Sequence, residues 1–251
     1  MLSLASDPGL PPPVRWPAIH SGAWSPGLAG PCRHGEIFAP SDEASGAGMA
    51  LALALDGLRA AAADLADWPD ERAWLWVQDK AALRLGGRPY RAGLPQSLRH
   101  RLIHVAAASP EDALFAIEEG LRCRDLAFVI GEIAGNPRAL GLTASRRLSL
   151  AAEKHEVPLW LVRLGSARDL GSARMRWEAR AAPSRRPRWN PYSPGAPAWH
   201  AELFRAHVFQ PGRWVLRDDG ALAAEPALDA QAAAGPAQAG PRDGPADTRS
   251  A

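Results

Sequence analysis

The sequence predicts an α/β fold in which a mainly parallel sheet is flanked by helices, with an antiparallel extension at its C-terminal end. Short apolar segments alternate along the chain with longer segments of helical spacing, which is the pattern of successive strand and helix units. The apolar segments are continuous, as in parallel strands covered on both faces. After Leu164 charged and apolar residues alternate instead, which is typical of an antiparallel strand with one face in water.

The parallel part of the sheet is expected to contain five strands. They lie at residues 35–39, 74–77, 101–105, 127–130 and 158–163. Three helices are expected between them, over residues 46–65, from 110 to about 122, and from 143 to about 155. Ser109 is the expected N-cap of the second helix because Pro110 follows at the first helical position, and Thr143 is the expected N-cap of the third.

The remaining segments are less regular in sequence. Residues 79–95 are broken by glycine and proline and are expected to form a connection. Beyond the parallel part we expect an antiparallel strand at 174–180, an irregular stretch at 183–197, a short helix at 198–207 and a last edge strand at 213–217.

Composition divides the chain into three parts. Residues 1–33 are rich in proline and glycine and are expected to form an extended leader that docks through Trp16 and Trp24. Residues 34–219 form the expected domain, with an Arg/Trp-rich extension from about 165 to 219. Residues 220–251 are dominated by alanine, proline and glycine and lack aromatic residues, so a disordered tail is expected.

Overall composition excludes several classes of protein. The 251 residues are 47% apolar and 22% charged, which is typical of a globular protein and excludes wholesale disorder or a fibrous class. Two cysteines cannot form a disulfide framework. No run of 18 apolar residues is present, and the N-terminus lacks the pattern of a signal peptide. We therefore expect a cytoplasmic protein without a membrane partner.

Positive charge is concentrated late in the chain. The formal net charge is +2, but residues 163–219 contain 11 arginines, no lysine and five acidic residues. Such a basic segment suits a polyanion or an acidic protein partner, although a solvated arginine-rich face has the same composition.

The loop after the first strand has two of the glycines of a phosphate-binding loop but lacks its other groups. Its central residues are Ser45, Gly46, Ala47 and Gly48. A phosphate-binding loop also needs a lysine and a Ser or Thr hydroxyl, and here Ala47 and Gly48 stand in their place. Asp42 and Glu43 add negative charge. These features favour a tightly packed turn, and the alternative is residual ATP binding through main-chain groups at the two glycines.

Other candidate chemical groups are sparse. The fourth strand ends at Gly131 and Glu132, where a nucleotide hydrolase would carry an acidic metal ligand. No cysteine and histidine spacing forms a zinc set, and no nucleophile motif is present. We therefore expect no catalytic residue, no bound metal and no cofactor.

The basic segment combines arginine with aromatic residues. The candidate binding residues are Arg185, Arg186, Arg188, Trp189, Trp199, Arg213 and Trp214. Arginine with interleaved aromatics is used to bind single-stranded nucleic acid, where guanidinium groups contact phosphates and rings stack on bases. The same residue types are enriched in the energetic centres of protein interfaces. The sequence favours a protein partner over DNA, and leaves both open.

Several motifs in order resemble the ImuA family. They are HGEIFAP, WLWVQD, EEGLRCRDLAFVIGEIAG, LTASRRLSLAAEKHEVPLWLVR, MRWEARAAPS and AELFRAHVFQPGRWVLR. The resemblance runs from about His34 to Arg217 and is most specific over residues 118–184 and 201–217.

The resemblance implies a RecA-like core and an accessory role in SOS-inducible, error-prone translesion DNA synthesis. It implies binding to an ImuB-like polymerase-related protein and to RecA, with an error-prone C-family DNA polymerase engaged indirectly, and a nucleoid location after DNA damage. RecA carries Gly-Lys-Thr in its first loop and an acidic residue at the position of Gly131, so this chain departs from it at both places. The expected function is thus a non-catalytic adaptor. The alternatives are a degenerate ATP-binding protein and a SulA-type cell-division inhibitor.

Overall fold

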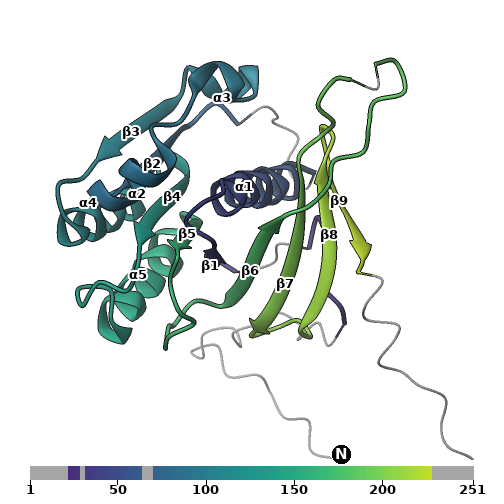
Figure 1. The fold of residues 1–251 in the computed structure, drawn as a ribbon. Helices are drawn as coiled ribbons and strands as arrows, with labels where there is room; N and C mark the ends of the chain where they lie inside the picture. Colours follow the sequence, from purple (N-terminus) through teal and green to yellow (C-terminus); the bar gives the residue numbers. More distant parts are fainter. Residues whose placement is uncertain (1–21, 29–31, 64–69, 191, 228–251) are drawn as a thin grey trace, which may run out of the picture.

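A computed structural model describes residues 22–28, 32–63, 70–190 and 192–227 (Figure 1). These residues form one mixed sheet with the strand order β3-β2-β4-β5-β1-β6-β7-β8-β9. The strands are β1 (His34–Ala39), β2 (Ala73–Gln78), β3 (Leu102–Ala106), β4 (Leu126–Ala134), β5 (Leu159–Leu164), β6 (Met175–Ala181), β7 (Ala198–Ala206), β8 (Gly212–Asp218) and β9 (Leu222–Pro226). The helices are α1 (Ser45–Ala63), α2 (Lys80–Gly86), α3 (Gln96–Arg99), α4 (Pro110–Arg122), α5 (Leu142–His155) and the short 3-10 helix η1 (Arg91–Gly93). The predicted fold class is confirmed.

Helices cover both faces of the parallel strands. Figure 1 shows α1 on one side of the sheet and α4 and α5 on the other. Alternate residues of each strand supply the two cores: Phe128 and Ile130 of β4 belong to the α1 side, whereas Val129 and Ile133 belong to the side of α4 and α5. This double burial explains why the strands are continuously apolar in sequence.

The extension beyond β1 differs in two ways from the prediction. The strand expected at 174–180 is β6, which pairs in parallel with β1 and antiparallel with β7. The helix expected at 198–207 is wrong, because this segment is β7. Trp199, Ala201 and Leu203 are buried while His200 and Glu202 between them are not, so the apolar period is that of a strand.

Two of the helix starts can be compared with their predicted caps. Ser109 caps α4 as predicted, since its hydroxyl accepts a hydrogen bond from the Asp112 amide at 3.1 Å. The prediction for Thr143 is wrong: α5 begins at Leu142 after Gly141, whose extended backbone holds the N-cap position without a side chain. The connection expected at 79–95 contains α2, which Asp79 caps through the Ala82 amide.

The segment preceding β1 docks on the antiparallel strands. Trp24 is 2% exposed and packs edge-on against Trp177 and Trp214, with ring centroids 4.8 and 5.6 Å away. Docking is therefore confirmed for Trp24, and Trp16 lies outside the described residues.

The prediction of a disordered tail from residue 220 is wrong for the first part of that tail. Leu222–Pro226 forms β9, so the strand predicted at 213–217 (β8) is not the edge of the sheet. Average composition hides these few residues, in which Leu222 enters the core and Glu225 pairs with Arg185 and Arg217. Residues 228–251 lie outside the described part of the chain.

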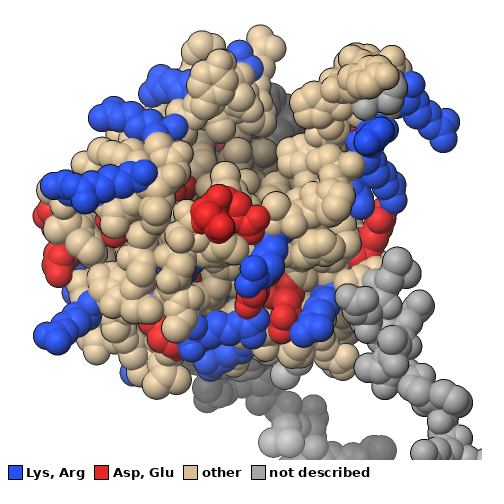
Figure 2. Space-filling view, viewed as in Figure 1, with Lys and Arg blue, Asp and Glu red and all other residues tan. Residues whose placement is uncertain are grey.

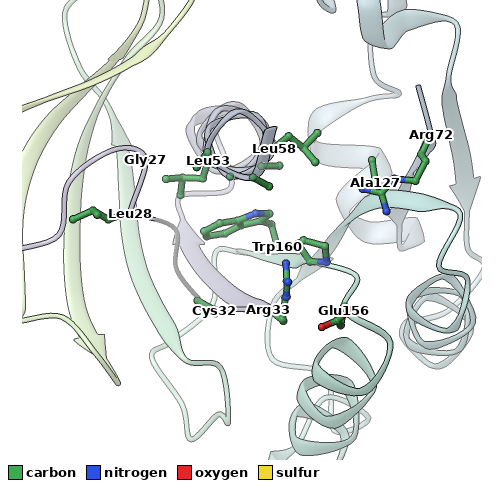
Figure 3. A pocket seen from close by; sticks show the side chains of 15 residues that line it. Gly27, Leu28, Cys32, Arg33, Leu53, Leu58, Arg72, Ala127, Glu156 and Trp160 are labelled. Carbon is green, nitrogen blue, oxygen red and sulfur yellow. The ribbon is translucent and has the colours of Figure 1, made fainter. Parts of the chain in front are cut away.

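A hollow of about 390 Å³ lies beneath the second half of α1, at the amino ends of the parallel strands (Figure 3). The Trp160 indole, Leu53 and Leu58 line it, with Arg33 and Glu156 among its polar residues. Open α/β sheets bind ligands at the carboxyl ends of their strands, which is the opposite edge. Within the described ranges, no helix has both the length and the apolar character needed to cross a membrane.

Candidate functional site

The first loop, residues 40–48, ends inside α1: Ser45, Gly46, Ala47 and Gly48 form the first turn of that helix, so their predicted position in a loop is wrong. The two glycines pack closely against neighbouring side chains. A Cβ atom at Gly46 would lie 2.7 Å from both Ala39 Cβ and Val162 Cγ1. A Cβ atom at Gly48 would lie 3.1 Å from the indole of Trp199, which is itself buried. The space in which a Ser or Thr side chain would stand at position 48 is therefore already filled.

The Glu43 carboxylate of the first loop forms hydrogen bonds with strand β6. The Glu43 carboxylate accepts hydrogen bonds from the Ala181 amide at 3.1 and 3.2 Å and from the Ser45 hydroxyl at 2.9 Å. Asp42 is exposed. The carboxylate of Glu43 thus ties the start of α1 to the end of β6.

If the glycines serve packing, substitution should change stability in the absence of any ligand. We expect Gly46→Ala to lower the free energy of unfolding by about 1–3 kcal/mol, because the new methyl group overpacks the contact with β1 and β5. The control is Gly86→Ala, where a Cβ atom meets nothing within 4 Å and stability should rise by up to about 1 kcal/mol. Urea unfolding measures both, and equal effects would contradict the packing role.

A hollow of about 400 Å³ opens beside the first loop at the carboxyl ends of the strands. Asp42, Glu43, Glu132 and Arg88 are the charged residues that line it, so three carboxylates face one guanidinium group. Ala47, at the position of the missing lysine, is also part of the lining. The balance of charge favours a cation over a phosphate in this hollow.

Glu132 is the buried acid of this hollow. Its two carboxylate oxygens accept hydrogen bonds from Trp76 Nε1 at 2.7 Å and Gln78 Nε2 at 3.0 Å. Burial raises the pKa of Glu132, while the two hydrogen bonds act in the opposite direction. Gln78 in turn meets His104 Nε2 through its amide oxygen at 2.9 Å.

The structure separates Gly131 from Glu132. A Cβ atom at Gly131 would overlap Ile117 Cδ1 of α4, on the face of the sheet away from the first loop. An acidic side chain at position 131 would therefore point into the apolar core beneath α4 and not into the hollow. Both residues lie inside β4, which continues to Ala134, so the predicted strand end is wrong. Of the two candidates, Glu132 alone reaches the side of the first loop.

Trp76 and Gln78 were not predicted as partners of Glu132. The signal is present as a two-residue period, since Trp74, Trp76 and Gln78 share one face of β2. The parallel register that sets Gln78 opposite Glu132 becomes visible with the sheet order.

The candidate residues of the basic segment separate into two groups. Trp199 and Trp214 are 6% and 8% exposed and belong to the core on the α1 side, so their indoles are not available to a partner. Their alternation with exposed residues along β7 and β8 gives the physical reason. Arg213 is exposed on the outer face of β8 and lies 3.5 Å from Glu202.

The second group stands together on one loop. Arg185, Arg186, Arg188 and Trp189 lie in the connection between β6 and β7, and the Trp189 ring and the Arg185 side chain are open to solvent. Figure 2 shows basic side chains gathered at the upper right, where this connection projects in Figure 1. The exposed Tyr192, which the candidate set did not include, belongs to the same connection.

A buried ionic cluster, which was not predicted from the sequence, lies on the face of the sheet away from α1. The Glu36 carboxylate accepts hydrogen bonds from Arg163 at 3.0 Å and Arg176 at 2.6 Å. Asp169 lies 3.1 Å from Arg163 and 3.5 Å from Arg176. Both guanidinium groups also lie over the ring of Phe38. The cluster joins β1, β5 and β6 and balances its own charge.

Cys32 and His34 are close in sequence, and burial changes the pKa of both side chains. Burial raises the pKa of the Cys32 thiol to about 12, and burial assisted by the charge of Arg176 lowers the pKa of His34 to about 3. The His34 Nδ1 atom lies 2.7 Å from the Ser149 hydroxyl. Among the described residues, no group of three His, Cys, Asp or Glu side chains could hold a metal ion.

Comparison with known proteins finds likenesses among solved structures and none among family models. The chain matches no family model and no curated protein sequence. The crystal structure of SulA from Pseudomonas aeruginosa aligns with 24% sequence identity, covering 52% of this chain and 98% of SulA, with a TM-score of 0.33. A likeness at this level assigns neither a family nor a function.

Proposed function

We propose that this chain is a non-catalytic adaptor in SOS-inducible, error-prone translesion DNA synthesis. It binds an ImuB-like protein and RecA, and engages an error-prone C-family DNA polymerase indirectly. The observation that supports a non-catalytic role is the first loop, in which side chains of neighbouring strands occupy the surroundings of Gly46 and Gly48.

Electrostatics of the adjacent hollow argue in the same direction. A nucleoside triphosphate brings several negative charges, and a site that binds it supplies lysine, a metal ion and main-chain amides. Here the Glu43 carboxylate already accepts a hydrogen bond from the Ala181 amide, and Asp42 and Glu132 add two further carboxylates. Among the described residues that line the hollow, Arg88 supplies the one guanidinium group. The repulsion opposes triphosphate binding at this edge.

The choice of pathway and partners comes from the ordered motifs between His34 and Arg217 that resemble the ImuA family. An adaptor needs surface for two partners and no reaction centre. The protein would act in the cytoplasm and join the nucleoid after DNA damage, where RecA forms filaments on single-stranded DNA.

The test is sedimentation of the full chain with RecA filaments assembled on single-stranded DNA, using a slowly hydrolysed ATP analogue to keep the filaments intact. We expect the chain to sediment with the filaments, to hydrolyse no ATP when assayed alone, and to show no thermal shift with Mg-ATP. RecA assayed alone is the positive control for hydrolysis.

Two outcomes would overturn the proposal. ATP hydrolysis by the chain without filament binding would make it an enzyme. Failure to bind both the filament and an ImuB-like protein, together with cell filamentation on overexpression in undamaged cells, would favour the cell-division alternative.

A further inference from the structure

The connection between β6 and β7, residues 182–190 and 192–197, forms an arm that projects from the sheet (Figure 1). Because β6 runs parallel to β1, the arm leaves from the same edge of the sheet as the first loop. Its two halves touch through their backbones: a Cβ atom at Gly195 would overlap the Arg185 carbonyl oxygen. Only glycine fits at position 195, and this contact holds the two halves of the arm against each other.

Contacts with β8 and β9 hold the base of the arm. Arg217 donates a hydrogen bond to the Pro183 carbonyl at 3.1 Å, and the Asp218 amide donates to the Pro197 carbonyl at 3.1 Å. Arg185 pairs with Glu225 of β9. The strands β8 and β9 therefore position the arm together, and Glu225 partly neutralises Arg185 and Arg217.

The rest of the arm presents unpaired charge beside exposed rings. Arg186 and Arg188 form no ion pair or side-chain hydrogen bond with any described residue. Trp189 is 80% exposed and Tyr192 is 97% exposed. Every other tryptophan in the described ranges is buried. Trp189 therefore leaves a large apolar ring in water that a partner could bury.

The arm borders a hollow of about 620 Å³ whose charge is opposite to that beside the first loop. Four arginines, at positions 185, 186, 188 and 217, face two carboxylates, those of Asp219 and Glu225. Trp189 also lines it. The positive charge attracts phosphate groups, and the indole offers a flat face for a base.

We propose that the arm binds single-stranded nucleic acid. Arg186 and Arg188 contact phosphates, and Trp189 and Tyr192 stack on unpaired bases. A duplex keeps its base faces covered and would leave the two rings unused, whereas every unpaired base offers a flat face to them. This inference goes beyond the proposed adaptor role and does not rest on it.

The test is fluorescence anisotropy of a labelled oligothymidylate titrated with the full chain at several salt concentrations. We expect binding that weakens as salt rises. Trp189→Ala combined with Tyr192→Ala removes two stacking rings and should weaken binding about 30-fold or more, with the salt dependence unchanged. Arg186→Ala combined with Arg188→Ala should reduce the slope of log K against log salt by about 1.4, since each phosphate contact on a single strand contributes about 0.7.

Matched controls come from the other side of the molecule. Arg138→Ala with Arg146→Ala removes two exposed arginines that form no ion pair with any described residue, and Phe115→Ala removes an exposed ring. Neither change should alter binding. Thermal unfolding of every variant should match the parent chain, because none of the substituted side chains belongs to the core.

Three results would overturn the proposal. One is unchanged affinity for the oligothymidylate in the arm variants. Another is equal competition by a duplex of the same length. The third is displacement by polyglutamate with no measurable binding to the oligothymidylate, which would assign the arm to an acidic protein segment instead.

Discussion

Glu36→Gln is expected to destabilise the folded chain by about 3–5 kcal/mol, more than any other substitution proposed for this protein. The change removes the negative charge that lies between two buried guanidinium groups, those of Arg163 and Arg176. Both arginines are less than 5% exposed, so water cannot replace the lost carboxylate. Asp169 remains as a partly exposed acid and cannot balance two charges. Urea unfolding at neutral pH measures the loss.

The control is Glu178→Gln, which removes a carboxylate of the same sheet from its pair with Arg168. That pair lies at the surface, where an ion pair contributes about 0–1 kcal/mol. We therefore expect the loss of stability to be larger in Glu36→Gln than in Glu178→Gln. If both lose the same small amount of stability, burial is not what makes the Glu36 cluster matter.

Continuous apolar segments were the strongest signal in the sequence, and the prediction failed at residues 198–207, where the pattern is different. The runs around Trp74, Phe128 and Leu161 predicted buried parallel strands because both faces of the sheet are covered there. Residues 198–207 were wrongly predicted as a helix because charged and apolar residues alternate imperfectly around Phe204 and Arg205. In the sheet, Arg168 covers the ring of Phe204 at 4.1 Å, so this apolar residue sits on the outer face.

The candidate sites depend on neighbours that sequence order does not reveal. The first loop was interpreted as a tightly packed turn because it lacks lysine, but Trp199, which fills the space at Gly48, comes 151 positions later. Glu132 was predicted to stand at a strand end but lies inside β4, and its contacts with Trp76 and Gln78 follow from the pairing of β2 with β4. Residues that meet through sheet order require the order to be known first.

The arm between β6 and β7 shows the same dependence. Its arginines and Trp189 were recognised from composition, and its shape was not. The shape comes from Gly195 against Arg185 and from Glu225 of β9, a strand in a segment whose composition predicted disorder. Trp199 and Trp214 were grouped with it because they are close in sequence, while burial places them in the core.

His34 makes stability fall as the pH is lowered. Burial, assisted by the charge of Arg176, lowers its pKa to about 3, below the ordinary value of 6.5. Above the ordinary value the folded and unfolded states are both neutral at this residue. Between 6.5 and about 3 the unfolded state takes up a proton that the folded state excludes, so the free energy of unfolding decreases as pH falls. The loss approaches about 5 kcal/mol across the whole window, since one pKa unit corresponds to about 1.36 kcal/mol.

The measurement is urea unfolding of the parent chain and of His34→Gln between about pH 7 and about pH 5, where the parent should lose about 2 kcal/mol through this residue. The variant should be less stable than the parent at about pH 7, because glutamine disturbs the contact with Ser149. Its stability should change less with pH, because glutamine does not titrate. His104, whose pKa burial also lowers, is present in both proteins and cancels in the comparison. His200→Gln, at an exposed position, should retain the slope of the parent. Equal slopes for the parent and His34→Gln would mean that the folded chain opens to admit the proton, and that the packing around His34 is looser than its 2.7 Å contact with Ser149 implies.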